Sequence, residues 1–150
     1  VYKRQLIKKL VECVSKGGNF LLNIGPDANG AIPPRAAETL DEIGRFMRVN
    51  GQSIYGCTQS VVPKPEWGRI TQNGSVLYLH IYENTLGPLP LFGINAQSIE
   101  SIRQLSDGRE IPLSHSWVHS DYPDMAFADL GPDPTLVDGT DTVLKLTLKE

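Results

Sequence analysis

The first residues with the types and spacing of a chemical site lie near Asp27. Asp27 and Asn29 begin a sequence similar to a calcium-binding loop, and Glu38 occupies its twelfth position. Such a loop needs an oxygen ligand at its fifth position and glycine at its sixth, where this sequence has Ala31 and Ile32. We therefore predict a plain turn here.

Histidine and cysteine offer two more possible sites. His115 and His119 are four residues apart, which is the spacing of two metal ligands on a helix. The stretch around them is typical of strand and loop, so we predict two surface imidazoles. Cys13 and Cys57 belong to no CxxC sequence and are predicted to be buried thiols. We expect no metal site and no cofactor.

Three aromatic residues share one face of a predicted strand. Residues 76–82 alternate, with leucine and isoleucine on one face and Tyr78, His80 and Tyr82 on the other. This second face has two interpretations. It is either a platform on which sugar rings stack, or a surface that packs against the rest of the protein.

Residues 1–56 are predicted to form two helices around a single strand. The first helix has apolar residues at helical spacing, Leu6, Ile7, Leu10, Val11 and Val14. Gly17 and Gly18 end it, because glycine accepts the left-handed conformation that closes a helix. The second helix is predicted from Pro33 or Pro34 to Asn50-Gly51, since a proline in the first turn loses no hydrogen bond.

Between these helices, residues 20–24 (Phe-Leu-Leu-Asn-Ile) are apolar on both faces. Such a strand is typical of a parallel α/β sheet with helices on each side. Each backbone group left unpaired after burial costs about 1–3 kcal/mol, and residues 1–56 contain no second strand. We therefore expect the partner strands to come from another part of a longer protein, another copy or another chain.

Residues 57–150 are predicted to be all-β. Strand candidates are residues 76–82, 89–94, 99–105, 110–113, 125–130 and 141–149. The dipeptides Asn73-Gly74, Asp107-Gly108 and Asp138-Gly139 mark turns between them. Short strands at this spacing predict an antiparallel β-sandwich.

Composition and charge exclude several classes of partner. The 150 residues are 40% apolar and carry a net charge of -3. Residues 1–56 contain eight Lys/Arg and five Asp/Glu, whereas residues 57–150 contain six Lys/Arg and twelve Asp/Glu. Neither part is basic enough to indicate a nucleic-acid partner. No run approaches the roughly 20 apolar residues of a membrane span, so we expect no membrane partner. A GxSxG elbow, a phosphate-binding loop and a dinucleotide fingerprint are also absent.

Several sequence features occur together in residues 10–57. They are Ser-Lys-Gly-Gly-Asn after the first helix, Leu-Leu-Asn-Ile-Gly-Pro, a Gly-then-Ile-Pro turn, and Val-Asn-Gly followed by Ile-Tyr-Gly. This combination closely resembles the end of the catalytic barrel in the α-L-fucosidases of glycoside hydrolase family 29. Residues 67–69, 77–80 and 141–146 are similar to the family's C-terminal β-sandwich.

The resemblance implies an α/β plus all-β fold. Residues 1–56 would be the last β/α unit of a (β/α)8 TIM-like barrel, and residues 57–150 the C-terminal antiparallel β-sandwich. The other barrel strands, upstream of this chain, would then be the missing neighbours of residues 20–24.

The resemblance also implies a retaining exo-glycosidase that releases terminal α-L-fucose by double displacement. Its aspartate nucleophile and glutamate acid/base, and its fucose-binding histidines, would lie upstream, so we expect no catalytic residue in this chain and no activity from the chain alone. Its partners would be a fucosylated oligosaccharide or glycoconjugate and the upstream part of the barrel. We expect a periplasmic or secreted location.

Asn23 is the one candidate substrate-binding residue. Barrel active sites lie at the C-terminal ends of the strands. If Phe20, Leu22 and Ile24 face the helices, then Asn19, Leu21 and Asn23 face the barrel axis. Asn23 would either orient a catalytic carboxylate or a fucose hydroxyl, or be an interior amide bonded to neighbouring strands. The alternative function for the whole chain is a non-catalytic carbohydrate-binding or structural β-sandwich module.

Overall fold

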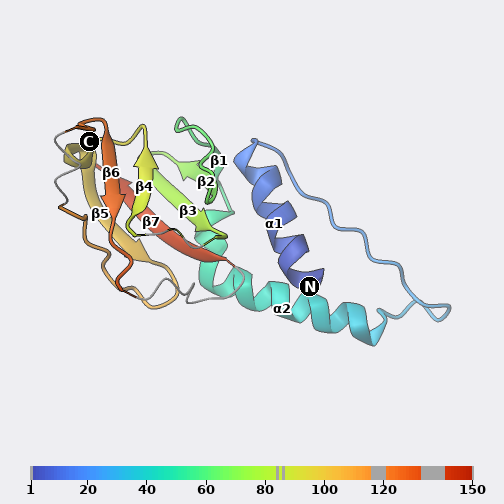
Figure 1. Ribbon diagram of the computed structural model, residues 1–150. Helices are drawn as coiled ribbons and strands as arrows, with labels where there is room; N and C mark the ends of the chain where they lie inside the picture. Colours follow the sequence, from blue (N-terminus) through green and yellow to red (C-terminus); the bar gives the residue numbers. More distant parts are fainter. Residues whose placement is uncertain (1, 84, 86, 116–120, 133–140, 150) are drawn as a thin grey trace.

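Two helices precede a set of antiparallel strands in the computed structural model, which describes residues 2–83, 85, 87–115, 121–132 and 141–149 (Figure 1). Helix α1 (Tyr2–Ser15) buries three apolar residues at helical spacing, Ile7, Val11 and Val14. Gly17, with a φ of 75°, ends the helix as predicted. The N–H groups of Gly17 and Gly18 bond to carbonyl oxygens in the last turn of α1, which satisfies groups that a helix end leaves open.

Helix α2 (Pro34–Asn50) has the predicted boundaries. Pro33 precedes it, Pro34 is its first residue, and the 3-10 helix η1 (Gly51–Ser53) follows directly. Its apolar side chains are half-buried, and three of them pack against the buried face of α1: Ile43, Phe46 and Met47. No helix among the described residues has the length and apolar character needed to cross a membrane.

The strand predicted at residues 20–24 does not form within this chain. The segment is extended but pairs with no other segment, because none of the described strands lies beside it. Figure 1 shows it running alone from the end of α1 to the turn before α2, away from the sheets. The predicted alternation is confirmed. Phe20, Leu22 and Ile24 are half-buried, whereas Asn19, Leu21 and Asn23 are exposed, Leu21 to 94%.

The strands form two antiparallel sheets. The larger has the order β1-β2-β3-β7-β5, and the smaller pairs β4 with β6. Their bounds are β1 Thr58–Gln59, β2 Gly68–Asn73, β3 Val76–Ile81, β4 Leu89–Phe92, β5 Ile99–Gln104, β6 Met125–Ala128 and β7 Thr142–Leu148, with the 3-10 helix η2 at Ala96–Ser98.

Five of the six strand candidates are confirmed, as β3, β4, β5, β6 and β7. The candidate at 110–113 is wrong, because Glu110 and Leu113 make only isolated bridges, to Arg103 and Ala128. Strands β1 and β2 were not predicted. β1 has only two residues, and β2 begins with a glycine and is mostly polar.

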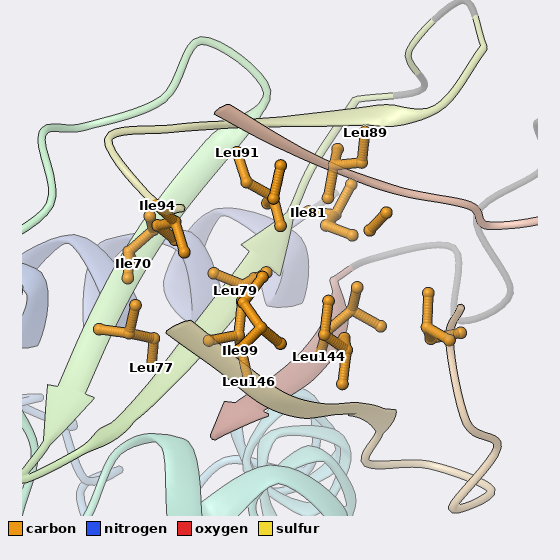
Figure 2. Packing of buried hydrophobic residues seen from close by; sticks show 14 of the residues in the cluster. Ile70, Leu77, Leu79, Ile81, Leu89, Leu91, Ile94, Ile99, Leu144 and Leu146 are labelled. Carbon is orange, nitrogen blue, oxygen red and sulfur yellow. The ribbon is translucent and has the colours of Figure 1, made fainter. Parts of the chain in front are cut away.

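The two sheets share one hydrophobic core, as expected of a small sandwich (Figure 2). Leu77, Leu79 and Ile81 of β3 point into it, as their alternation predicted, and Leu89 and Leu91 of β4 meet them from the smaller sheet. The opposite face of the larger sheet is covered by α1 and η1. A second cluster there joins three buried residues of α1 with the residues that directly follow η1 and β3: Ile7, Val11, Val14, Ile54 and Tyr82.

Candidate functional site

A groove lies between the extended segment and the two helices. Its volume is about 460 Å³, and Leu22, Asn23 and Ile24 line one side of it. The helices contribute mainly apolar side chains, among them Leu6 and Leu40. No lining residue carries a carboxylate or an imidazole, so the groove lacks the pair of carboxyl groups that glycoside hydrolysis needs.

Asn23 is the polar residue that the extended segment brings to this groove. It is exposed, and its side-chain amide makes no hydrogen bond to another described residue. An amide carries two donors and one acceptor oxygen, so Asn23 can bind a sugar hydroxyl or a carboxylate. The donors and the acceptor oxygen of the Asn23 amide are therefore available to groups outside this chain.

Asp27, just beyond the groove, is a turn residue. Its Oδ1 accepts hydrogen bonds from the backbone N–H of Asn29 at 2.8 Å and of Ala31 at 2.9 Å. The N–H of Gly30 also donates to the Asp27 carbonyl oxygen at 3.0 Å. The plain-turn prediction is confirmed, since this carboxylate already serves the backbone.

Thr71, His80 and Asp141 have the order of a nucleophilic triad, which the sequence analysis missed. His80 Nδ1 lies 2.7 Å from Asp141 Oδ2, and His80 Nε2 lies 3.4 Å from Thr71 Oγ1. The side chains of His80 and Asp141 are 0% exposed, and the Thr71 hydroxyl donates to the Ser53 carbonyl oxygen at 2.7 Å. No substrate reaches these groups, so they join β2, β3 and β7 to η1 rather than catalyse.

Tyr82 covers the same group on the side of α1. Lys8 Nζ lies 4.5 Å from the centre of its ring, and an Arg4 guanidinium nitrogen donates to its carbonyl oxygen at 3.4 Å. Burial, together with the charge of Asp141, raises the pKa of Tyr82 far above its ordinary value. The hydroxyl therefore stays protonated at ordinary pH, and it is buried without a hydrogen-bond partner among the described residues.

The sugar-stacking interpretation of this face is wrong. Tyr78 is 5% exposed and His80 0%, and Tyr82 lies beneath Lys8. Burial also raises the pKa of the Tyr78 hydroxyl. The packing interpretation is confirmed, because the face contacts α1 and η1 and presents no open aromatic ring to a sugar.

An ion cluster links β2 to α1 at the edge of this interface. Glu12 Oε1 lies 2.9 Å from an Arg69 guanidinium nitrogen and 2.8 Å from Lys16 Nζ, and Oε2 lies 3.3 Å from Lys9 Nζ. The ammonium groups of Lys16 and Lys9 lower the pKa of Glu12 to about 2. This carboxylate stays ionised at ordinary pH and cannot act as a general acid.

The two thiols are half-buried rather than buried, because both lie at the rim of the helical layer. Cys13 Sγ donates to the Asn19 carbonyl oxygen at 3.2 Å. Burial raises the pKa of the Cys57 thiol, which therefore stays protonated and poorly nucleophilic.

No group of three or more metal-ligating side chains occurs in the part of the chain that the structure describes. His115 is exposed, and His119 lies outside the described residues.

The comparison with known proteins gives one family. Residues 2–52 match the sequence profile of the α-L-fucosidase family. An α-L-fucosidase of Dictyostelium discoideum is 41% identical over 83 residues, which cover 53% of this chain and 18% of that protein. The plasma α-L-fucosidase of Rattus norvegicus is 51% identical over 51 residues, which cover 34% and 11%. The chain thus matches less than a fifth of the length of these relatives.

Solved structures match nearly the whole chain. α-L-Fucosidase isoenzyme 1 from Paenibacillus thiaminolyticus superposes with a TM-score of 0.91 and 46% identity, over 99% of this chain and 35% of that protein. A family 29 α-L-fucosidase from Bacteroides thetaiotaomicron, trapped as a covalent intermediate, has a TM-score of 0.83 over 99% of this chain and 32% of its own. At 21% identity, the second match shows the fold alone.

Proposed function

This chain corresponds to part of an α-L-fucosidase of glycoside hydrolase family 29, and on that premise we propose that the whole enzyme hydrolyses terminal α-L-fucose. Residues 1–56 supply the last β/α unit of a (β/α)8 barrel, and residues 57–150 the C-terminal sandwich. The substrate is a fucosylated oligosaccharide or glycoconjugate, and the enzyme works in the periplasm or outside the cell.

The observation that carries this proposal is the extended segment at residues 19–24. It has one half-buried apolar side against the helices and one exposed side that carries Asn19, Leu21 and Asn23. A strand in a barrel has the same two sides, one toward its helices and one toward the barrel axis. The strong superposition on the Paenibacillus enzyme supports the same placement, because it includes both the helical part and the sandwich.

The proposed chemistry is double displacement with retention of configuration. It needs two carboxyl groups about 5–5.5 Å apart, one ionised and one protonated. Among the described residues, three carboxylates near the groove or the sheet already serve other contacts: Asp27 holds a turn, Glu12 an ion cluster and Asp141 a buried histidine. In keeping with the family resemblance, we place the nucleophilic aspartate and the acid/base glutamate in the upstream part of the enzyme.

The test is to assay this chain alone and with its upstream barrel sequence on an aryl α-L-fucoside. The chain alone is expected to give no turnover, because no carboxylate lines its groove. The joined protein is expected to release fucose, and NMR of the first-formed sugar should show the retained anomer. Hydrolysis by the isolated chain, or a joined protein that cleaves other glycosides and not fucosides, would contradict the proposal.

Replacing Asn23 by alanine in the full enzyme is expected to lower kcat/KM about tenfold. The reason is that a hydrogen bond to a charged group contributes about 1.5–3 kcal/mol, and its loss from the transition state appears directly in kcat/KM. The measurement is steady-state kinetics with the same fucoside.

Asn19→Ala is the matched control for Asn23. It removes the same amide from the same exposed face, at the opposite end of the segment. It is expected to leave kcat/KM nearly unchanged. Equal losses in the two variants would assign both residues to packing within the barrel.

The carbohydrate-binding module is the weaker candidate. It depends on the face around Tyr78 and Tyr82, and that face is covered by α1 and η1. A free-standing module would also have no use for the unpaired extended segment at residues 19–24.

A further inference from the structure

The sequence contains three Asn-Gly dipeptides, at residues 29–30, 50–51 and 73–74. In such a pair the backbone nitrogen of the glycine can attack the side-chain amide carbon of the asparagine. Glycine permits this reaction because it has no side chain to obstruct the approach. The reaction also requires that the nitrogen be free and that the asparagine be accessible, and here the three pairs differ.

The pairs at residues 29–30 and 50–51 are held in hydrogen-bonded turns. The N–H of Gly30 donates to the Asp27 carbonyl oxygen at 3.0 Å. The N–H of Gly51 donates to the Met47 carbonyl oxygen in the last turn of α2, and Asn50 is only 4% exposed. In both pairs the attacking nitrogen must first lose a backbone hydrogen bond.

The third pair lies in the turn between β2 and β3. Asn73 pairs with Val76 across the hairpin, which leaves Gly74 and Ser75 as the two loop residues. Asn73, Gly74 and Ser75 are all exposed, and Gly74 has a φ of 58°. Its carbonyl oxygen accepts a bond from the Gln72 amide, but its N–H bonds to no described residue.

We infer that Asn73 is the site at which this protein deamidates in its folded state. The Gly74 nitrogen bonds to Cγ of Asn73, the bond from Cγ to Nδ2 breaks, and ammonia leaves with the proton from the Gly74 amide. Water then opens the succinimide ring at either carbonyl, which yields aspartate or isoaspartate at position 73. This inference does not depend on the proposed fucosidase activity.

Isoaspartate at this position would alter three strands. It inserts an additional methylene into the backbone beside the Asn73–Val76 pair. The neighbouring Ser75 carbonyl oxygen also accepts the N–H of Leu148 from β7 at 2.9 Å. The modification therefore loosens the ends of β2, β3 and β7 together, because hairpin register depends on loop length.

The experiment is to age the intact enzyme in mildly alkaline buffer, folded and in denaturant, and to map the three peptides by mass spectrometry. In the folded enzyme, the Asn73 peptide is expected to convert at least about tenfold faster than the other two, because their nitrogens must each break a hydrogen bond. Denaturant is expected to bring the three rates close together, since the dipeptide is the same. An isoaspartate-specific methyltransferase should label the folded sample, and the label should disappear in Asn73→Gln.

Two outcomes would overturn the inference. One is conversion of the Asn29 or Asn50 peptide as fast as that of Asn73 in the folded enzyme. The other is an unchanged Asn73 peptide over a period in which all three convert in denaturant.

Discussion

Replacing Asp141 by alanine is expected to destabilise the sandwich by about 3 kcal/mol, because it leaves a buried histidine without its hydrogen-bonded partner. The side chains of His80 and Asp141 are both 0% exposed, and His80 Nδ1 lies 2.7 Å from Asp141 Oδ2. The substitution also leaves a cavity where the carboxyl group packed.

The measurement is hydrogen exchange of the β3 and β7 amides in the intact enzyme, since exchange reports local opening without assuming two-state unfolding. Protection is expected to fall by about a hundredfold, which is what 3 kcal/mol gives. Glu100→Ala on β5 is the matched control, because Glu100 is exposed and makes no ion pair with the described residues, so its effect should stay within about 0.5 kcal/mol.

A double variant tests whether the effect comes from the pair itself. Replacing His80 by leucine together with Asp141→Ala removes both polar partners and fills part of the space with apolar atoms. The double variant is expected to be less destabilised than the sum of the two single variants. Simple additivity would mean that the two residues contribute through separate contacts.

Replacing Gly68 by alanine is expected to prevent the normal pairing of β2 with β3, at a cost of about 3 kcal/mol. Gly68 pairs with Ile81, and a Cβ at this position would lie far inside the contact distance of the His80 carbonyl oxygen. That atom belongs to the backbone of the central strand, so it cannot move aside as a flexible side chain would. Trp67 and Arg69, which flank Gly68, would shift with the strand.

Gly44→Ala is the control, because the added methyl group meets only the end of the Arg48 side chain, at 3.6 Å. Gly44 lies inside α2, where alanine is favoured over glycine by about 1 kcal/mol. Gly68→Ala is thus expected to lower the stability of the protein, and Gly44→Ala to raise it. The measurement is the thermal midpoint and the soluble yield of the intact enzyme, and an unchanged midpoint for Gly68→Ala would contradict the prediction.

The sequence predicted those parts of the fold that are determined by neighbouring residues along the chain. Pro33-Pro34 and Asn50-Gly51 gave the ends of α2, because proline and glycine act on the backbone where they stand. The alternation in residues 76–82 gave β3 and its core face, because a strand separates its side chains by period two.

The parts that could not be predicted depend on contacts between distant residues. His80 meets Asp141 across 61 residues of sequence, and no local pattern encodes that pairing. The alternation identified the face that holds Tyr78 and His80, but whether helices cover it depends on how η1 and α1 pack. At residues 20–24 the two-sided apolar pattern indicated a strand, yet a ladder requires a neighbour and the described residues offer none.

The solitary extended segment at residues 19–24 affects how this protein can be produced. An extended chain with open N–H and C=O groups and a leucine 94% exposed is a template for pairing with other molecules. Expressed alone, the polypeptide is expected to collect in inclusion bodies or on chaperones. During synthesis of the proposed whole enzyme, the ribosome releases the other barrel strands first, so the segment meets its proper neighbours as it emerges. Co-expression with the upstream part of the enzyme is therefore the rational route to soluble material.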